Sequence, residues 1–415
     1  MKGFFSRIAA IGAVLLLAAC SSGSPASAPT DVTVVPGDGR VTVSWTMSAD
    51  VEYWLFYAPA SSISVDDWAS IPGSSSIRGA VSPQVVSGLT NGTTYAFTIN
   101  GRYDGGPGGP GSPSISAIPR LAGAEWTVGA SLAPTTNDLR GIAYGAAFVA
   151  VGTNGAMFSS PDAVTWTPQN STVATHLNGV INGGNYVAVG NATVGAGGVI
   201  LQSSDAVTWT PRINPDTTNN LNAVTNGGGI YVAVGASGTI ITSTDALNWT
   251  LAISSGITSN DLYAVTFGNG VYVAVGAGGT LLTSPDASVW TVVSSNTSSA
   301  LRGVAYGSPT VAGNVTPTYV AVGDGGTLVT STNGGVTWTL QAPLGGTTMN
   351  AVTYGTQFIA VGNGGSIFVS VDGVTWQAAT SVTPGTTDNL NAVAFSPAGA
   401  RYGAVGAAGA NLSAF

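Results

Sequence analysis

The stretch that decides the fold runs from residue 222 to residue 249 and reads NAVTNGGGIYVAVGASGTIITSTDALNW. It holds an apolar segment, a glycine turn, Tyr-Val-Ala-Val-Gly, a second turn, another apolar segment, Ser-x-Asp and Trp. The same skeleton occurs seven times in the chain. Its Val-Gly glycines are Gly152, Gly190, Gly235, Gly276, Gly323, Gly362 and Gly406. Its tryptophans are Trp126, Trp166, Trp209, Trp249, Trp290, Trp338 and Trp376. A period of roughly 40 residues indicates a propeller or a solenoid.

Each repeat holds four short apolar segments separated by turn residues, which in this copy are 221–224, 231–234, 239–242 and 249–252. Four strands in such a unit make a propeller blade, so residues 124–415 predict a seven-bladed β-propeller. The array begins with an isolated Trp126 segment, and its last unit ends without a tryptophan. We therefore expect the N-terminal segment to supply the missing outer strand of the last blade and to close the ring.

The composition favours an all-β protein. Charged residues make up 7% of the chain and hydrophobic residues 44%, and there are 59 glycines, so a core can form between turn-rich strands. The formal net charge is −8. Nucleic-acid binding depends on clustered Lys and Arg, so this charge argues against a nucleic-acid partner.

The first residues are typical of an export signal. Residues 1–19 have a basic start and then an apolar run, which predicts a signal peptide, with a membrane anchor helix as the alternative. The sequence Leu17-Ala18-Ala19-Cys20 resembles the lipobox of bacterial lipoproteins; the alternative is a stray cysteine in an ordinary signal. The resemblance implies a lipidated Cys20, attachment to the membrane, and a place in the bacterial cell envelope. In Gram-negative lipoproteins a residue other than Asp after the cysteine favours the outer membrane, so the resemblance together with Ser21 implies that location. Residues 20–27 would be a tether.

Residues 28–119 predict a separate β domain. Alternating apolar residues at 32–35 and 41–45 flank a Pro-Gly-Asp-Gly turn, and further short strands follow every 8–12 residues. With Ala28-Pro29 at its entry, Trp45 on the second strand and a Leu89-to-Tyr95 segment, the domain resembles a fibronectin type III domain. We expect it to act as a spacer.

Six copies of a Ser-x-Asp turn precede the tryptophans. They resemble the Asp-box hairpin of sialidase-type propellers, although most are one residue shorter. The acidic or amide residues are Asp162, Asp205, Asp245, Asp286, Asn333 and Asp372. We expect a structural role, in which the carboxylate caps turn amides while the tryptophan packs beneath the hairpin.

The sequence offers no obvious catalytic set. Sialidases use three arginines, a Tyr–Glu pair and an acid, but Glu125 is the single Glu of this propeller and lies in the closing strand. The lone histidine, His176, has no partners that suggest a metal site or a catalytic triad. We therefore predict no catalytic residue, no metal and no cofactor. The unassigned acids Asp138, Asp261, Asp324 and Asp388 could in principle serve glycosidase chemistry.

One repeat position suggests recognition. The residue after the first apolar residue of each innermost strand is Arg140, Asn178, Asn222, Tyr263, Arg302, Asn350 or Asn391. These residues, which we name the ring residues, would surround one mouth of the central channel. They suit a sugar, a peptide end or a carboxylate. The alternative is that the asparagines satisfy neighbouring blades.

The sequence-based hypothesis is a non-enzymatic envelope lipoprotein whose propeller binds a partner protein or a glycan. The propeller also resembles the assembly-factor propellers of photosystem II. The alternative is a carbohydrate-active hydrolase, glycosidase- or sialidase-like, with acids in the propeller channel. A purely structural role at the cell surface is a third possibility. A convergent pair of acids at the channel mouth would favour the enzyme.

Overall fold

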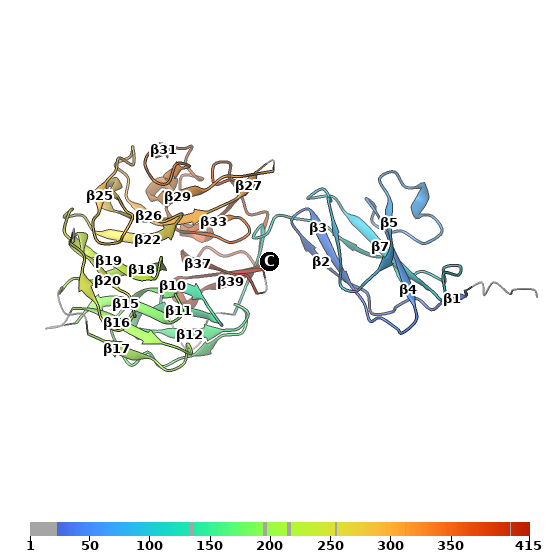
Figure 1. Cartoon of the computed structure of the whole chain (residues 1–415), viewed down its shortest axis with the longest axis horizontal. Coiled ribbons are helices and arrows are strands. Elements are labelled where there is room, and N and C mark those ends of the chain that lie inside the picture. The colour runs from blue at the N-terminus through green and yellow to red at the C-terminus, as the bar shows by residue number, and fades with distance from the viewer. Residues whose placement is uncertain are drawn as a thin grey trace, which may run out of the picture. The chain divides into compact units, whose positions relative to one another are not determined.

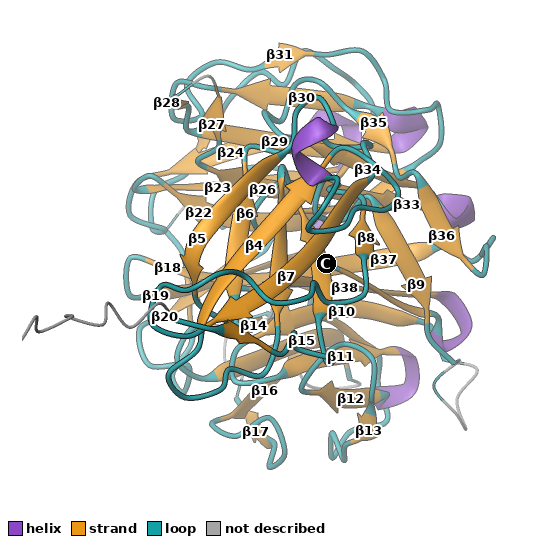
Figure 2. Cartoon of the chain, turned by 90° about the vertical axis from the view of Figure 1, so that its right-hand side faces the viewer, coloured by secondary structure: helices purple, strands orange, loops and turns teal. Residues whose placement is uncertain are grey.

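The computed structural model describes residues 23–415 except 131, 133–136, 194–196, 214–216, 254, 312 and 399. The predicted signal peptide and Cys20 lie outside the described residues. The chain divides into two compact units between Arg120 and Leu121. The described residues of both units form strands, and their helical structure is confined to short 3-10 turns (Figures 1 and 2). No helix in the described part of the chain is both long and apolar enough to span a membrane.

The N-terminal unit consists of two antiparallel sheets. One has the order β2-β3-β6; the other has the order β1-β7-β4-β5, with β8 also pairing with β7. The elements are β1 (Pro25–Ala26), β2 (Thr33–Gly37), β3 (Arg40–Ser44), β4 (Glu52–Ala58), η1 (Trp68–Ser70), β5 (Ser75–Ala80), β6 (Gln84–Ser87), β7 (Tyr95–Arg102) and β8 (Ile115–Ala117).

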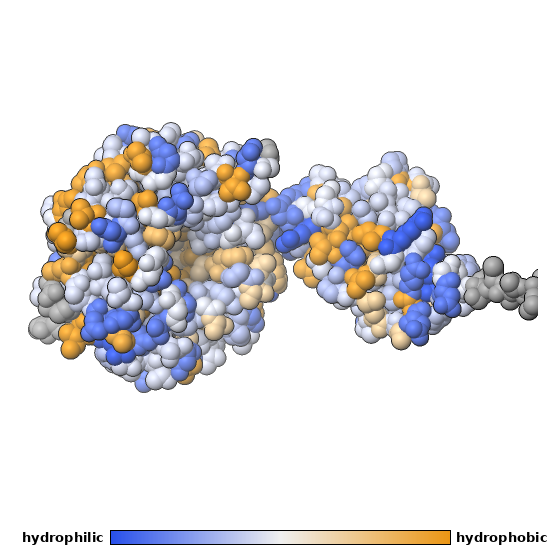
Figure 3. Space-filling model, viewed as in Figure 1, coloured by the Kyte–Doolittle hydropathy of each residue, from blue (hydrophilic) through white to orange (hydrophobic). Residues whose placement is uncertain are grey.

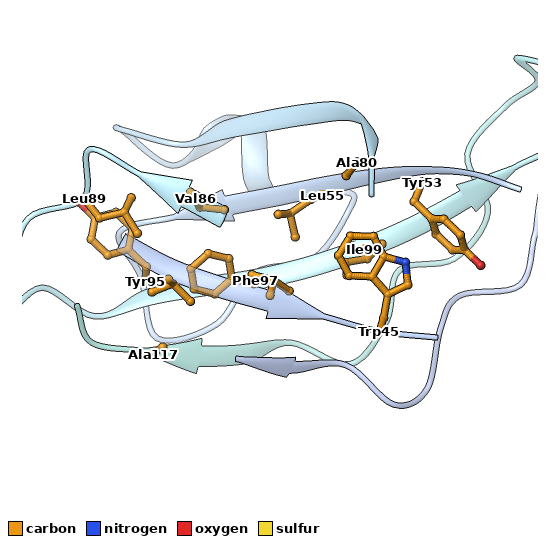
Figure 4. Packing of buried hydrophobic residues seen from close by; sticks show 12 residues of the cluster. Trp45, Tyr53, Leu55, Ala80, Val86, Leu89, Tyr95, Phe97, Ile99 and Ala117 are labelled. Carbon is orange, nitrogen blue, oxygen red and sulfur yellow. The ribbon is translucent and has the colours of Figure 1, made fainter. Parts of the chain in front are cut away.

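The core of this unit lies between its two sheets. Alternate residues of β3, such as Val41 and Val43, meet Leu55 of β4 and Phe97 of β7, and all four are fully buried. Trp45 packs edge-on against Tyr53 with ring centroids 5.7 Å apart (Figure 4). Burial of each such side chain stabilises the fold by about 1.5–3 kcal/mol, so this core accounts for the independent compactness of the unit.

The second unit is a propeller of seven sheets within the described residues, which agrees with the sequence prediction. Figure 1 shows inner strands near the centre of the ring and fourth strands at its edge. Blade 1 contains β10 (Leu139–Tyr144), β11 (Phe148–Gly152), β12 (Met157–Ser160) and β13 (Thr167–Pro168). Blade 2 contains β14 (Leu177–Asn182), β15 (Tyr186–Ala192), β16 (Gly198–Ser203) and β17 (Thr210–Arg212). Blade 3 contains β18 (Leu221–Gly227), β19 (Ile230–Gly235), β20 (Ile240–Ser243) and β21 (Thr250–Leu251). Blade 4 contains β22 (Leu262–Gly268), β23 (Val271–Gly276), β24 (Leu281–Ser284) and β25 (Thr291–Val292). Blade 5 contains β26 (Leu301–Gly307), β29 (Thr318–Gly323), β30 (Leu328–Ser331) and β31 (Thr339–Leu340). Blade 6 contains β32 (Met349–Tyr354), β33 (Phe358–Gly362), β34 (Ile367–Ser370) and β35 (Gln377–Ala378).

Blade 7 joins the two ends of the propeller. Its strands are β37 (Leu390–Ser396), β38 (Arg401–Gly406), β39 (Asn411–Ala414), β9 (Glu125–Val128) and β36 (Ser381–Thr383). The closing strand β9 pairs antiparallel with β39, and Trp126 lies 6.4 Å from Tyr402 between ring centroids. The predicted closure by the Trp126 segment is therefore confirmed. The parallel pairing of β36 with β9 was not predicted.

Short turns join the second and third strands of six blades. They are η2 (Thr153–Gly155), η3 (Ala236–Gly238), η4 (Ala277–Gly279), η5 (Asp324–Gly326), η6 (Asn363–Gly365) and η7 (Ala407–Gly409). Blade 5 also carries a small hairpin, β27 (Thr310–Val311) with β28 (Asn314–Val315).

The repeated Val-Gly glycine has a steric cause. In blade 4 a Cβ on Gly276 would lie 2.0 Å from the carbonyl oxygen of Asp261, the residue that precedes the innermost strand. The backbone of Gly276 is extended, so the constraint is close approach and not a left-handed conformation. The corresponding glycines of the other blades face equally close carbonyl oxygens. This approach holds the turn against the start of the inner strand in every blade.

Candidate functional site

The ring residues share one backbone feature. In each innermost strand the pairing with the second strand shifts register immediately after the first residue, for example between Leu139 and Gly141 in blade 1. The same irregularity occurs in the other six blades. The skipped residues are Arg140, Asn178, Asn222, Tyr263, Arg302, Asn350 and Asn391. A β-bulge leaves its extra residue outside the ladder and redirects its side chain. The bulge therefore leaves one residue of each innermost strand without a pairing partner on the second strand, and its side chain can point toward the central axis.

All seven ring residues line a single cavity of about 190 Å³. The residues that follow them in the strands are small, either glycine as at Gly303 or alanine as at Ala351, and they line the same cavity. A Cβ on Gly303 would lie 2.9 Å from the Cα of Ala351 in the next blade, because the inner strands converge here. Figure 3 shows the propeller surface hollowed near its middle.

The four asparagines of the ring share one structural bond. Each donates its side-chain amide to the carbonyl oxygen of the first inner-strand residue in the following blade. The pairs are Asn178–Leu221 (2.9 Å), Asn222–Leu262 (2.9 Å), Asn350–Leu390 (2.9 Å) and Asn391–Leu139 (2.8 Å). The alternative interpretation of these asparagines, that they satisfy neighbouring blades, thus has a direct geometric basis.

The other three ring residues are placed differently. Arg140 donates from Nη1 to the side-chain oxygen of Asn178 at 2.8 Å. Arg302 forms an ion pair with Asp324 and lies 5.7 Å from the ring centroid of Tyr263, within cation–π range. The carbonyl oxygens that face these blades, on Leu177, Leu301 and Met349, receive no side-chain hydrogen bond from the described residues. The ring therefore has a structural part, made of amides, and a part that carries charge and an aromatic face.

No Asp or Glu is among the described residues that line the cavity. Asp138 and Asp261 accept hydrogen bonds from backbone N–H groups of the preceding blade, on Ala408 at 3.1 Å and Ser237 at 2.9 Å. Asp388 contacts Thr386, and Asp324 is paired with Arg302. These acids, which the hydrolase alternative would need, are not brought together as a pair in the cavity.

His176 also joins two blades. Its Nδ1 accepts a hydrogen bond from the backbone N–H of Asn154 at 3.0 Å, in the turn of blade 1. Asn220 and Asn389 hold the same position and accept from Ala192 and Gly364 in the same way. This second set of inter-blade bonds was not predicted from the sequence. The polar residue that directly precedes most innermost strands could have indicated it. Among the described residues no group of three potential metal ligands gathers.

The Asp-box residues cap their hairpins. Asp205 accepts from the backbone N–H groups of Thr208 and Val207 at 2.7 and 2.9 Å, and these bonds lower its pKa to about 2. Trp209 donates its indole N–H to the carbonyl oxygen of Ala206 and packs 6.3 Å from Tyr186 between ring centroids. The other carboxylates accept in the same way, and Asn333 accepts from Thr337. All six side chains are therefore engaged with their own turns.

No protein-family model matches the sequence, and no curated protein does. Solved structures do match the fold. YCF48 from Cyanidioschyzon merolae is 20% identical with a TM-score of 0.52, over 70% of this chain and 98% of that one. YCF48 bound to a D1 peptide is 20% identical with a TM-score of 0.54, over 70% and 96%. A catalytically inactive virginiamycin B lyase from Staphylococcus aureus with quinupristin is 10% identical with a TM-score of 0.58, over 70% and 98%. At these identities the likeness shows that the chain shares the propeller fold of these proteins.

Proposed function

We propose that the protein is a non-enzymatic binding protein that holds an anionic segment of a partner protein at the central cavity of its propeller. The observation that carries the proposal is the division of the ring. Asparagine is the residue that ties one blade to the next, yet blades 1, 4 and 5 have Arg140, Tyr263 and Arg302 there.

Two of these replacements, Tyr263 and Arg302, forgo a hydrogen bond to the next blade. A hydrogen bond between neutral groups contributes about 0.5–1.5 kcal/mol net to folding. In the described part of the chain, blades 4 and 5 lack the inter-blade amide bond that four blades make, and blade 1 replaces it by the bond from Arg140 to the side-chain oxygen of Asn178. The three positions direct two cations and one aromatic ring to the cavity. Positions that give up a stabilising bond for charge are typical of functional sites. We therefore assign the charged part of the ring to ligand binding.

The chemistry of this part suits a carboxylate beside an apolar or planar group. The guanidinium of Arg140 can donate to both oxygens of a carboxylate, and Tyr263 offers a flat face. The propeller of YCF48 has been solved with a D1 peptide, which supports a peptide segment as the occupant over a glycan. A glycan remains an outcome that the experiment below distinguishes.

The remaining parts of the chain would support this binding. We propose that the N-terminal unit is a fibronectin type III domain. Its two antiparallel sheets support this, as does the hydrogen bond from the backbone N–H of Thr90 to the Tyr95 hydroxyl, which a tyrosine corner would make. We propose that this unit is a spacer. On the sequence Leu17-Ala18-Ala19-Cys20 we propose a lipid anchor at Cys20 and a place in the bacterial envelope at the outer membrane.

The proposal can be tested with an array of eight-residue peptides, each with a free or an amidated C-terminus, beside oligogalacturonate and maltoheptaose. We expect the full chain to bind peptides that carry a free carboxylate, and we expect Arg140→Ala to weaken this binding about tenfold. Arg212→Ala is the matched control, because Arg212 bonds to Gln202 in the outer part of blade 2 and does not line the cavity.

Unchanged peptide binding by Arg140→Ala would contradict the proposed site. Binding to the glycans alone would replace the protein partner with a carbohydrate. Release of reducing sugar from either glycan would restore the hydrolase hypothesis.

A further inference from the structure

We propose that Asp324 sets the anion specificity of the central cavity, because it occupies the guanidinium of Arg302 and leaves Arg140 as the cation that receives the ligand. The inference rests on the proposed function, since it concerns the same cavity. It goes further because it names a residue outside the ring that determines whether the cavity prefers a segment with one anionic group or with several.

Asp324 is unusual for its position. It is the first residue of the η5 turn, and the corresponding residues of the other described turns are Thr153, Ala236, Ala277, Asn363 and Ala407. In blade 5 alone among these turns an acidic residue stands beside a ring arginine of its own blade. In blade 6 the same two positions hold Asn363 and Asn350, which bond to each other at 2.9 Å. The contact between these positions is thus a feature of the fold, and blade 5 makes it with charges.

The pair has the geometry of a carboxylate held by a guanidinium fork. Arg302 meets Asp324 through Nε to Oδ1 and through Nη2 to Oδ2, the second at 3.4 Å. A ligand carboxylate would use the same donors, so Asp324 competes with it directly. Both side chains are 41% exposed, and an exposed ion pair contributes about 0–1 kcal/mol to folding. Stability alone therefore gives little reason for the pair.

The ion pair determines the net charge at the ring. Arg140 and Arg302 are the cations of the ring, and Asp324 cancels one of them, so that the ring and its contacts carry a net charge of +1 (2 − 1). Arg140 is bonded to an uncharged amide and keeps its full charge. A segment with one carboxylate meets this charge, whereas a segment with several carboxylates is repelled by Asp324. We infer that the cavity selects a singly anionic peptide segment.

The test uses the full chain and two fluorescent eight-residue peptides of otherwise neutral sequence. The first has its terminal carboxylate as the single anionic group, and the second carries two additional aspartates next to that terminus. Affinity is measured by fluorescence anisotropy at low and at high salt. For Asp324→Asn we expect a gain of about three- to tenfold for the second peptide at low salt, and less than about twofold for the first. The gain should shrink at high salt, because exposed charges are screened.

Two variants make the result specific. Asp388→Asn removes the same charge from a residue that contacts Thr386 and does not touch the ring, and we expect it to leave both affinities unchanged. Arg302→Ala added to Asp324→Asn should abolish the gain, because the freed guanidinium is what the extra carboxylates meet. The thermal midpoint of each variant checks that it is folded.

The outcomes separate this inference from the function on which it rests. If Arg140→Ala weakens binding of the first peptide but Asp324→Asn does not favour the second, the cavity binds anions and Asp324 has no part in selection. If Asp324→Asn and Asp388→Asn have equal effects, the change reflects overall charge and the inference is wrong. If neither peptide binds any variant, or if Arg140→Ala has no effect, the proposed function itself fails.

Discussion

The side-chain amide of Asn391 donates a hydrogen bond to the carbonyl oxygen of Leu139 at 2.8 Å, and this bond joins the last blade to the first. The two residues are 252 positions apart in the chain. The same bond links Asn222 to Leu262 at 2.9 Å between consecutive blades. The ring is thus closed at its inner edge by a side chain and at its outer part by the pairing of β9 with β39.

Loss of the inner closure should destabilise the propeller. We expect Asn391→Ala to lower the free energy of unfolding by about 1–2 kcal/mol, because the carbonyl oxygen of Leu139 loses its side-chain donor. Urea unfolding of the full chain measures the change. Asn222→Ala removes the same bond away from the closure, so a matching loss there would show that the bond matters at any blade junction. No loss in either variant would contradict a structural role for the ring asparagines.

Asparagine at position 263 should be more stable than alanine there and should weaken binding. In Tyr263→Asn the new amide can reach the carbonyl oxygen of Leu301 as the other ring asparagines reach theirs. We expect a gain of about 0.5–1.5 kcal/mol relative to Tyr263→Ala, measured by urea unfolding. Both variants should bind the singly anionic peptide more weakly, because both lack the aromatic face. Equal stability of the two variants would show that the bond does not form in blade 4.

Two glycines of the Asp-box turns separate packing from backbone strain. Gly373 and Gly334 have φ values of +79° and +74°, so alanine is strained at both. A Cβ on Gly373 would lie 2.8 Å from Cγ2 of Val320, whereas a Cβ on Gly334 meets nothing within 4 Å. We expect Gly334→Ala to cost about 1–2 kcal/mol. Gly373→Ala should cost about 1–3 kcal/mol more, because its neighbours must move. Equal losses on thermal or urea unfolding would mean that the core beside Gly373 adapts freely.

The Asp-box carboxylates should make stability fall in acid. The pKa of Asp205 is lowered to about 2 from an ordinary value of 3.8, chiefly by the backbone N–H groups of Thr208 and Val207. A group whose pKa is lower in the folded state stabilises the fold above the unfolded pKa and loses that effect as the pH falls. We therefore expect the contribution of Asp205 to disappear between about pH 4 and pH 2.

Substitution of the charged group should flatten this dependence. Asp205→Asn keeps an acceptor oxygen, as the natural Asn333 copy does, but cannot take up a proton. Urea midpoints between pH 4 and pH 2 should fall less steeply for Asp205→Asn than for the unsubstituted chain. Asn333→Asp should have the opposite effect. Parallel pH profiles for all three proteins would show that these carboxylates do not couple to folding.

The sequence by itself determined the all-β class, the seven repeats, the closing strand and the capping role of the Asp-box residues. Each of these follows from local chemistry that recurs at a readable spacing. The Ser-x-Asp turn closes on its own backbone amides within three residues, so no distant contact is needed to predict it. The isolated Trp126 segment and the missing last tryptophan revealed the closure because a four-strand blade must be completed.

Only the tertiary structure decided which ring residues bond to the backbone of the next blade and which carry the charges and the aromatic face that we propose for binding. That distinction depends on the bulge that frees the side chain, and on the carbonyl oxygen that a neighbouring blade places about 40 residues away in the chain. The pairing of Arg302 with Asp324 and the parallel strand β36 were hidden for the same reason. Contacts between blades depend on how the sheets converge on the axis. The repeat pattern shows which polar residues recur at a position, but the partner of each side chain in the next blade depends on that convergence.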